Sequence, residues 1–277
     1  MCFPPELFAV TDLEQRFGGI VRLYGRGALD RLRAAHVCVI GLGGVGSWSV
    51  EALARSGVGA LTLVDLDDVC VTNINRQSHA LPGTVGRPKV EVLAERLHAI
   101  APDIRIQPVL EFFTAASAET IFAARFDYVI DAIDSLSNKC RLLALCRDRQ
   151  IPVITCGAAG GRRDPTAVRI TDLARASHDR LLAQVRKQLR AEHGFPRDPA
   201  ALDVDCVYSA EAPVFPHADG TICATKKEAR ASAAAEDPFR LNCNSGLGSA
   251  TFVTGAFGFA AAAHVVTKLG SGEFGVR

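Results

Sequence analysis

A strand that runs into a glycine-rich turn and then a helix constrains the fold of this chain more than any other feature. Residues 36–41 are mostly apolar and predict the strand, and residues 47–57 predict the helix. Four glycines lie in the turn: Gly41, Gly43, Gly44 and Gly46. Unpaired backbone N–H groups and the helix dipole at such a turn favour a bound phosphate. Asp65 lies 19 residues beyond Gly46, at the end of a second apolar segment, where a carboxylate accepts ribose hydroxyls.

Further apolar segments alternate with amphipathic ones. They predict strands at residues 60–64, 104–110, 128–134 and 153–156, and a helix at 88–100. This alternation predicts an α/β fold, a Rossmann-like, doubly wound and mostly parallel sheet covered on both faces. Binding residues then belong at the carboxyl ends of the strands.

The regions on either side of this core are less regular. Residues 1–35 predict an N-terminal arm of short helices, interrupted at Gly18 and Gly19. Beyond Gly157 we expect a charged helix at 174–194 and a long irregular insertion at 195–240. The chain is thus divided into the arm, a nucleotide-binding core at 36–160, and an extension at 161–277 that completes the same domain.

Composition excludes some classes of function. A formal net charge of +1 gives no global attraction to nucleic acid or to an anionic membrane, so any RNA surface must be local. Nine cysteines contain no C-x-x-C pair, and no secretory signal begins the chain. We therefore expect a cytoplasmic chain with reduced cysteines and no zinc clasp, although a cluster of Cys206, Cys223 and Cys243 stays open.

Residues 241–267 contain no Asp, Glu, Lys or Arg, which on length alone would allow a membrane span. The segment is rich in Gly, Ala, Ser, Thr and Phe, and small residues suit close helix packing. A buried core or dimer helix is favoured over insertion, and peripheral membrane association through this segment is the alternative.

Cationic and amide side chains follow Asp65 and Asp67 closely. Asn73, Asn75 and Arg76 occupy a polar loop that would bring a cation to the distal phosphates of a nucleotide. Lys89 stands at a helix start, where the dipole disfavours a cation unless a phosphate neutralises both. The alternatives are a solvated surface arginine and lysine, and a turn role for Asp67.

Asp134 ends the predicted strand at 128–134. One or two carboxylates with phosphate oxygens are the usual environment of Mg²⁺, so Asp134 is the candidate metal ligand and Asp131 the weaker one. Capping of the helix near Ser137 is the alternative role. Together these groups suit attack of a carboxylate on the α-phosphate of ATP, which yields an acyl adenylate.

As a set, these motifs resemble the adenylating domain of ubiquitin-activating-type enzymes, which include the molybdopterin and thiamine sulfur-carrier activators. The motifs are Gly41-x-Gly43-x-x-Gly46, Asp65-x-Asp67, Asn73-x-Asn75-Arg76-Gln77, Gly86-Arg87-Pro88-Lys89 and Asp131-x-x-Asp134. Three further segments are similar to the branch that dehydrates threonylcarbamoyladenosine in transfer RNA: residues 16–25, 206–211 and 246–254.

The resemblance implies a reaction and a role for each residue. ATP would adenylate the threonyl carboxylate of the modified adenosine next to the anticodon, and the neighbouring carbamoyl group would close onto it and expel AMP. Asp65 would hold the ribose, Asn73 and Arg76 the phosphates, Lys89 the ribose or α-phosphate region, and Asp134 the Mg²⁺. Arg16 would reach the γ-phosphate from a partner subunit, which implies a homodimer.

Other readings stay open. One is an activator of a ubiquitin-like sulfur carrier, another is an NAD-dependent oxidoreductase, and a third is a module that binds nucleotide without turnover. A cysteine-desulfurase or sulfur-acceptor partner is a further possibility. The basic residues after the fifth strand are candidates for RNA contact or for a solvated helix face: Arg162, Arg163, Arg169, Arg175, Arg180, Arg186, Lys187 and Arg190.

Overall fold

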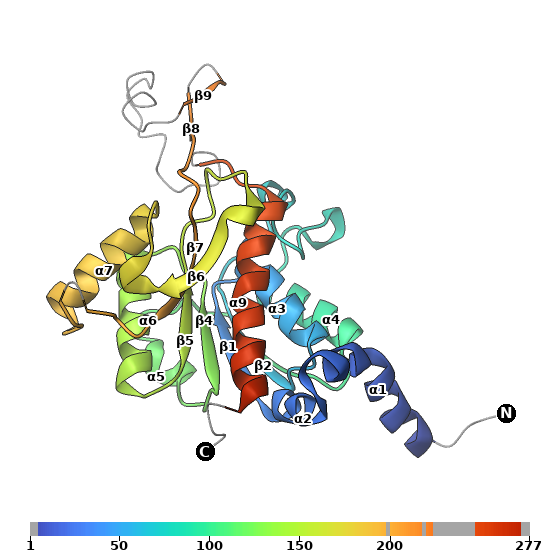
Figure 1. Cartoon of the computed structure of the whole chain (residues 1–277). Coiled ribbons are helices and arrows are strands. Elements are labelled where there is room, and N and C mark those ends of the chain that lie inside the picture. Colours follow the sequence, from blue (N-terminus) through green and yellow to red (C-terminus); the bar gives the residue numbers. More distant parts are fainter. Residues whose placement is uncertain (1–4, 198–199, 218–219, 224–246, 273–277) are drawn as a thin grey trace.

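The computed structural model of the chain describes residues 5–197, 200–217, 220–223 and 247–272. Its centre is a seven-stranded sheet with the strand order β3-β2-β1-β4-β5-β7-β6 (Figure 1). All neighbours are parallel except β6 and β7. The strands are β1 (His36–Ile40), β2 (Ala60–Val64), β3 (Arg105–Val109), β4 (Tyr128–Asp131), β5 (Val153–Cys156), β6 (Val168–Asp172) and β7 (Asp205–Ser209). The predicted α/β class is confirmed.

Helices cover both faces of the sheet because its central strands are apolar on both sides. In β1, Val37 and Val39 belong to one hydrophobic cluster, whereas Cys38 and Ile40 belong to another. The helices among the described residues are α1 (Pro5–Tyr24), α2 (Arg26–Ala34), α3 (Gly46–Arg55), α4 (Lys89–Ile100), α5 (Ala118–Ile121), α6 (Leu136–Asp148), α7 (Arg180–Glu192) and α9 (Thr251–Ser271). Helices α3, α4 and α9 pack on the first face, and α5 and α6 on the second (Figure 1).

Short elements complete the fold. The described part of the chain contains the 3₁₀ segments η1 (Val71–Asn73), η2 (Pro82–Thr84), η3 (Pro165–Ala167) and η4 (Leu173–Arg175). Strands β8 (Phe215–Pro216) and β9 (Ile222–Cys223) form a separate antiparallel pair.

The N-terminal arm differs from its prediction. Helix α1 continues through Gly18 and Gly19 and ends only before Gly25. The φ of 87° at Gly25 is a backbone conformation that glycine adopts readily and other residues rarely adopt. Phe17 is 3 % exposed and joins the main core with Leu29 of α2. Burial of this ring offsets the low helix propensity of the two glycines.

The region beyond Gly157 is more regular than its composition predicts. Strand β7 lies inside the expected irregular insertion and pairs with β5, so the sheet extends by two strands. The prediction missed β6 because it is an edge strand with exposed residues, which weakens its apolar signal. The expected charged helix at 174–194 is confined to Arg180–Glu192.

Helix α9 is the one described helix whose length and composition would allow it to cross a membrane. In this structure 56 % of its most apolar window is buried, and its residues belong to the main core. Gly258 explains this packing: a Cβ there would lie 2.6 Å from the Val45 carbonyl oxygen, so α3 and α9 approach at the glycine. The buried-helix interpretation therefore fits residues 251–271, while residues 241–246 lie outside the described part.

Candidate nucleotide site

The glycine turn between β1 and α3 is shaped by backbone contacts at its two ends. Gly41 has a φ of 89°, and a Cβ there would lie 2.8 Å from the Ala132 carbonyl oxygen. At Gly46 a Cβ would lie 1.9 Å from the Gly41 carbonyl oxygen. Gly43 differs, since the nearest atom to its ideal Cβ is Gln77 Nε2, at 3.9 Å. The backbone is thus closely packed at both ends of the turn, against Ala132 and against Gly41, and has room beside Gly43, as a backbone that admits a phosphate requires.

Asp65 lies beside this turn, directly after β2. It is 7 % exposed, and its carboxylate accepts the N–H groups of Leu42 at 2.7 Å and Asp67 at 2.8 Å. Burial raises the pKa of the Asp65 carboxyl, while Lys89 and the two N–H donors oppose that rise. The carboxylate is therefore oriented by the turn itself, in the place predicted for a ribose ligand.

Lys89 begins α4 and points back toward the strand ends. Its side chain is 6 % exposed, and its ammonium lies 2.8 Å from a carboxylate oxygen of Asp67, which is half exposed. Asp67 is therefore more than a turn residue, because it balances the cation that the helix dipole disfavours. This pair lies next to Asp65, so a nucleotide there would meet both charges.

The loop between β2 and α4 carries the predicted phosphate ligands. Asn73 is buried and caps η1 by accepting the Cys70 N–H at 2.9 Å. Asn75 donates to the Ser249 carbonyl at 2.8 Å, which ties the loop to the segment before α9. The Arg76 guanidinium donates to the Thr72 carbonyl at 2.5 Å and to Asn75 Oδ1 at 3.0 Å. Asn73 thus shapes the loop, and Arg76 presents the cation.

The surroundings of Gln77 and Gly43 fit a bound nucleotide. Gln77 is 7 % exposed, yet its Oε1 has no hydrogen-bond partner among the described residues. Its Nε2 is the nearest atom to the ideal Cβ position of Gly43, so this side chain lies beside the glycine turn. A buried polar atom without a partner costs free energy unless a ligand or water completes it. The residues present therefore fit a nucleotide, because its hydroxyl or amino groups can donate to Gln77 Oε1 while its phosphate oxygens accept from Nε2. The sequence analysis placed Gln77 in a motif but gave it no role.

Asp131 and Asp134 have different roles in the structure. Asp131 is fully buried, and one oxygen accepts Lys139 Nζ at 2.8 Å and Thr155 Oγ1 at 2.7 Å. Because Lys139 neutralises it, Asp131 is not available as a metal ligand, and that weaker candidate is wrong. Asp134 is exposed in the loop before α6 and bonds to no described residue, while Ser135 occupies the N-cap. A free carboxylate at the strand ends fits a Mg²⁺ ligand when phosphate oxygens supply the rest.

Arg16 lies away from this site in its own chain. It belongs to α1 and donates to the Ile100 carbonyl at 3.2 Å, at the opposite end of α4 from Lys89. Twelve helical residues separate these ends by about 16 Å. A phosphate role for Arg16 therefore needs a second copy of the chain, and that role stays a prediction.

Comparison with known proteins places the chain in a family. The ThiF family model matches residues 18–273. The chain belongs to the ThiF family. The tRNA threonylcarbamoyladenosine dehydratase of Escherichia coli is 50 % identical, over 92 % of this chain and 93 % of that protein. The Haemophilus influenzae protein of the same name is 45 % identical, over 94 % and 95 %.

Solved structures agree with this membership. The E. coli tRNA N6-threonylcarbamoyladenosine dehydratase in complex with ATP superposes with a TM-score of 0.81 and 44 % identity, covering 93 % of this chain and 95 % of that one. The molybdopterin-synthase adenylyltransferase of Salmonella typhimurium is 41 % identical, but over only 47 % of this chain and 51 % of that protein. Similarity to the dehydratases thus extends across the ThiF chain, including β6, β7 and α9.

The basic residues after β5 do not act as one group in this ThiF protein. Arg162 is 3 % exposed and lies 3.6 Å from the buried carboxylate of Asp179, which caps α7. Its guanidinium also donates to the carbonyls of Ala158, Gly160 and His178, so it is a structural residue and the RNA interpretation of Arg162 is wrong. The exposed members of the set are Arg163, Arg169, Arg175, Arg180 and Lys187.

The cysteines that the structure describes are all free thiols. Cys206, the first of the three that left a cluster open, is buried in β7, and burial raises its pKa. Burial likewise raises the pKa of Cys140 to about 11 and of Cys156 to about 12. Within the described residues no cluster of three or more His, Cys, Asp or Glu side chains could hold a metal, and Cys243 lies outside them. The structural interpretation of Cys206 is confirmed.

Proposed function

We propose that this chain is an ATP-dependent dehydratase that cyclises threonylcarbamoyladenosine in transfer RNA. The observation that carries the proposal is 50 % identity to a protein of that name over 92 % of the chain, together with the open glycine turn beside Asp65. The molybdopterin-synthase adenylyltransferase matches only 47 % of this chain, whereas the dehydratase matches 92 % of it.

The reaction has two steps with balanced atoms. A carboxylate oxygen of the threonyl group attacks the α-phosphorus of ATP, and the bond to pyrophosphate breaks. The carbamoyl group then attacks the activated acyl carbon, loses a proton, and AMP leaves with the original carboxylate oxygen. Because both groups belong to one nucleoside, closure gains from a high effective molarity and requires no enzyme thiolate. This agrees with the raised pKa values of the buried cysteines.

Each site residue has a task in that chemistry. The glycine turn and Arg76 bind phosphate oxygens, and Asp65 binds the ribose. Lys89 stabilises charge that develops around the α-phosphorus, after exchange of its contact with Asp67. Asp134 would hold Mg²⁺, which when bound neutralises charge on the phosphates and the leaving pyrophosphate.

Nucleoside mass spectrometry tests the proposal. Transfer RNA that carries threonylcarbamoyladenosine is incubated with the protein and ATP, then digested. We expect a mass decrease of one water at that nucleoside and stoichiometric AMP release. AMP release that depends on a small carrier protein instead of RNA would favour the second candidate, a sulfur-carrier activator, for which the half-length adenylyltransferase match is the supporting observation.

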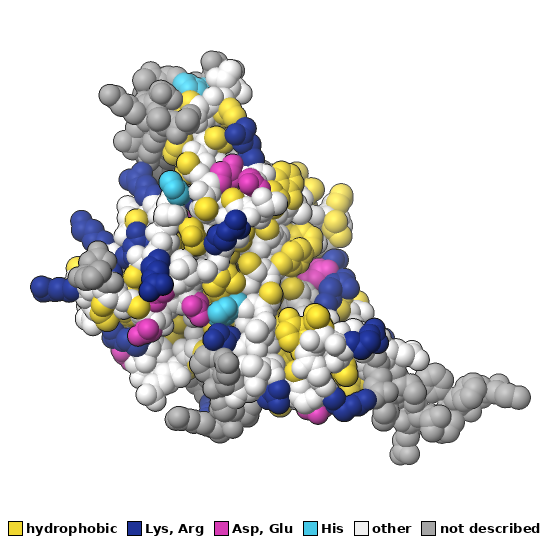
Figure 2. Space-filling model, in the orientation of Figure 1, with side chains coloured by type: hydrophobic (Ala, Val, Ile, Leu, Met, Phe, Trp, Pro, Cys, Tyr) yellow, Lys and Arg dark blue, Asp and Glu magenta, His cyan; other side chains and the backbone are white. Residues whose placement is uncertain are grey.

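The exposed basic side of α7 is proposed to contact the RNA phosphates. A hollow of about 520 Å³ lies along this helix, lined by Arg186, Lys187, Arg190, Arg197 and two alanines. Figure 2 shows Lys and Arg side chains gathered on that side of the molecule. Phosphate contacts of this kind position an RNA without reading its sequence.

Charge reversal tests this surface. Lys187→Glu together with Arg197→Glu is expected to raise KM for transfer RNA about tenfold. The slope of log RNA affinity against log salt concentration should become shallower by about two, because two phosphate contacts are lost. KM for ATP should not change. Arg105→Glu, an exposed residue at the opposite edge of the sheet, is the matched control. Equal KM values for RNA in both variants would remove the surface and leave the reaction untouched.

We further propose a homodimer in which Arg16 completes the site of the partner. Exposed apolar side chains support an interface: Phe252 is 57 % exposed and Phe259 50 % on α9, and Val71 is 66 % exposed in η1. Hydrophobic side chains lie along α9 on the face in Figure 2. Such a patch suits a two-fold contact between copies.

Subunit mixing tests that arrangement. Arg16→Ala and Asp134→Ala should each be inactive alone. Mixed after subunit exchange, they should recover about a quarter of native activity, because half of the dimers then contain one complete site. Failure to recover any activity, with mixed dimers present, would place Arg16 outside the site.

A further inference from the structure

The backbone carbonyl of Arg76 is held by side chains from two helices. The indole Nε1–H of Trp48, on α3, donates to it at 3.0 Å, and Thr254 Oγ1, on α9, lies 3.3 Å from it. The Thr254 hydroxyl carries one proton and lies equally far from two carbonyls of its own helix. Trp48 is therefore the donor that is committed to Arg76.

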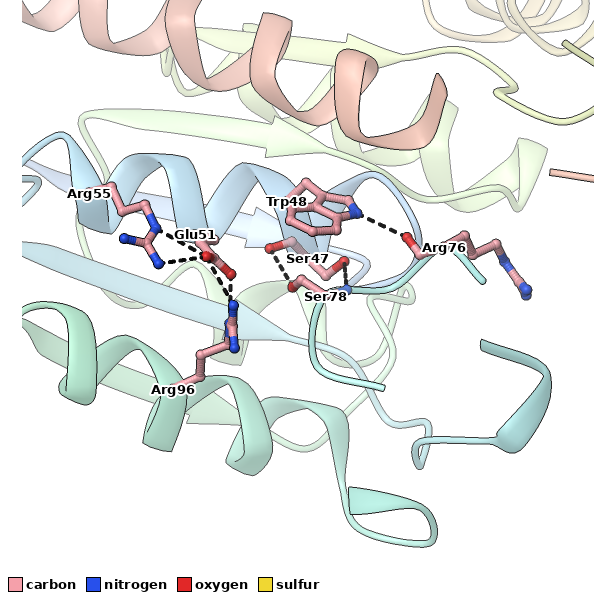
Figure 3. Close-up of polar contacts among 7 residues, drawn as sticks. All are labelled: Ser47, Trp48, Glu51, Arg55, Arg76, Ser78 and Arg96. Atoms are coloured by element: carbon pink, nitrogen blue, oxygen red, sulfur yellow. Dashed lines mark hydrogen bonds and ion pairs between the residues drawn. The ribbon is translucent and has the colours of Figure 1, made fainter. Parts of the chain in front are cut away.

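The bond orients the side chain of Arg76. Figure 3 shows the carbonyl turned toward the indole, while the guanidinium extends away from it. The stem of Arg76 packs on the glycine turn, since a Cβ on Gly44 would lie 3.4 Å from Arg76 Cγ. Trp48 thus fixes the direction in which this cation leaves the loop.

The same helix also holds the other parts of the site. Ser78 donates its N–H to Ser47 Oγ and its hydroxyl to the Ser47 carbonyl, both at 3.3 Å (Figure 3). One turn further along α3, Glu51 accepts Arg96 of α4 at 2.6 Å. Because α3 begins at the glycine turn and Lys89 begins α4, one rigid helix carries the turn, the arginine loop and the lysine in a fixed arrangement.

We propose that Trp48 is a positioning residue for ATP, which acts by holding the Arg76 backbone so that the guanidinium meets the phosphates. This rests on the proposed function only in assigning ATP as the ligand. Misplacement of a binding group by a fraction of an ångström weakens both binding and reaction, so the loss of one N–H donor should be measurable. The indole does not touch the nucleotide in this account.

The sequence makes an atomic test possible, because Trp48 is the one tryptophan of the chain. Biosynthetic replacement of tryptophan by 3-benzothienylalanine exchanges the N–H for sulfur and keeps the ring shape. Trp48→Phe also removes the N–H donor and in addition makes the ring system smaller. In both proteins we expect about a tenfold loss of ATP affinity, the factor that corresponds to one lost hydrogen bond.

The readout separates positioning from general damage. ATP affinity is measured by calorimetry without RNA, so it does not depend on the proposed reaction, and turnover and melting temperature are measured beside it. Positioning predicts that ATP binding weakens about tenfold, while KM for transfer RNA is unchanged and the melting temperature falls by no more than a few degrees. Thr254→Val should act in the same direction but less, since its hydroxyl is shared among three carbonyls.

Ser56→Ala is the matched control, because it removes a 2.8 Å hydrogen bond to Ala52 at the far end of the same helix. It should bind ATP as the native chain does. Native ATP affinity in the benzothienyl protein would overturn the proposal, and so would parallel losses of ATP affinity, RNA affinity and melting temperature. A native chain that binds ATP but does not dehydrate RNA would remove the proposed function and leave the role of Trp48 intact.

Discussion

Gly43 and Gly46 stand three residues apart in one turn, yet their surroundings assign them different tasks. Gly46→Ala would place a methyl group 1.9 Å from a backbone oxygen, so we expect the turn to distort and the melting temperature to fall by several degrees. Gly43→Ala meets only Gln77 Nε2 at 3.9 Å, so the fold should persist. Its methyl group would fill the space for phosphate, and ATP affinity should fall about 100-fold or more.

Thermal unfolding and calorimetry with ATP separate these two outcomes. Gly83→Ala is a suitable control, because its Cβ meets no atom within 4 Å and it lies in η2. If Gly43→Ala bound ATP as well as the native chain, the phosphate would have to lie elsewhere than above this glycine.

The charged groups of Arg76 and Asp134 contribute little to the stability of the fold. Asp134 is exposed without a described partner, and the hydrogen bonds that the Arg76 guanidinium makes to described residues are to Thr72 and Asn75 of its own loop. Arg76→Ala and Asp134→Ala should therefore lower turnover about 100-fold or more while the melting temperature stays within about 2 °C of native. AMP release with modified transfer RNA measures the first quantity. Near-native turnover in either variant would remove the role assigned to that residue.

At the scale of elements, the closeness of α3 and α9 depends on one glycine. A Cβ on Gly258 would meet the Val45 carbonyl at 2.6 Å and Trp48 Cβ at 2.8 Å, so Gly258→Ala must separate the helices. Gly255, one turn earlier, has only ordinary contacts beyond 3.6 Å. We expect urea unfolding to show a loss of about 2 kcal/mol for Gly258→Ala and a small gain for Gly255→Ala, because alanine favours helix. Equal effects would mean that α9 can slide along α3.

Elements with a strong local pattern could be predicted from the sequence. Strand β2 occupies residues 60–64 as expected, because all five side chains are buried and polar residues follow. Strand β7 was missed since Asp205 and Ser209 at its ends and a long irregular composition around it conceal a short apolar centre. The pairing of Asp131 with Lys139 was also missed, because it joins a strand end to a helix across a loop and has no fixed sequence spacing.

In the site, too, residues with a local sequence pattern could be predicted, whereas contacts between distant segments could not. Asp65 and the glycine turn were predictable because each lies at the end of a strand, where backbone geometry fixes its place. The roles of Trp48 and Gln77 depend on contacts between separate segments, which only the folded chain brings together.

For the molecule as a whole, His79 makes stability depend on pH. Its ring is 1 % exposed, and neither nitrogen has a hydrogen-bond partner among the described residues. Burial first, and then the charges of Lys89 and Arg96, lower the pKa of His79 from 6.5 to about 4. Between these values the unfolded chain binds a proton that the folded chain does not. The free energy of unfolding should therefore fall as pH decreases from about 6.5 to 4, by about 3 kcal/mol in total.

Urea unfolding between pH 7.5 and 4.5 checks this dependence against two variants. His79→Leu removes the titrating ring, so its stability should decline less across the window, and the difference from the native chain cancels contributions from carboxyl groups that both share. His98→Ala removes an exposed histidine on α4 and should keep the native slope. Identical slopes for His79→Leu and the native chain would mean that the folded chain protonates this ring as readily as the unfolded chain does, as a buried water bonded to the ring would allow.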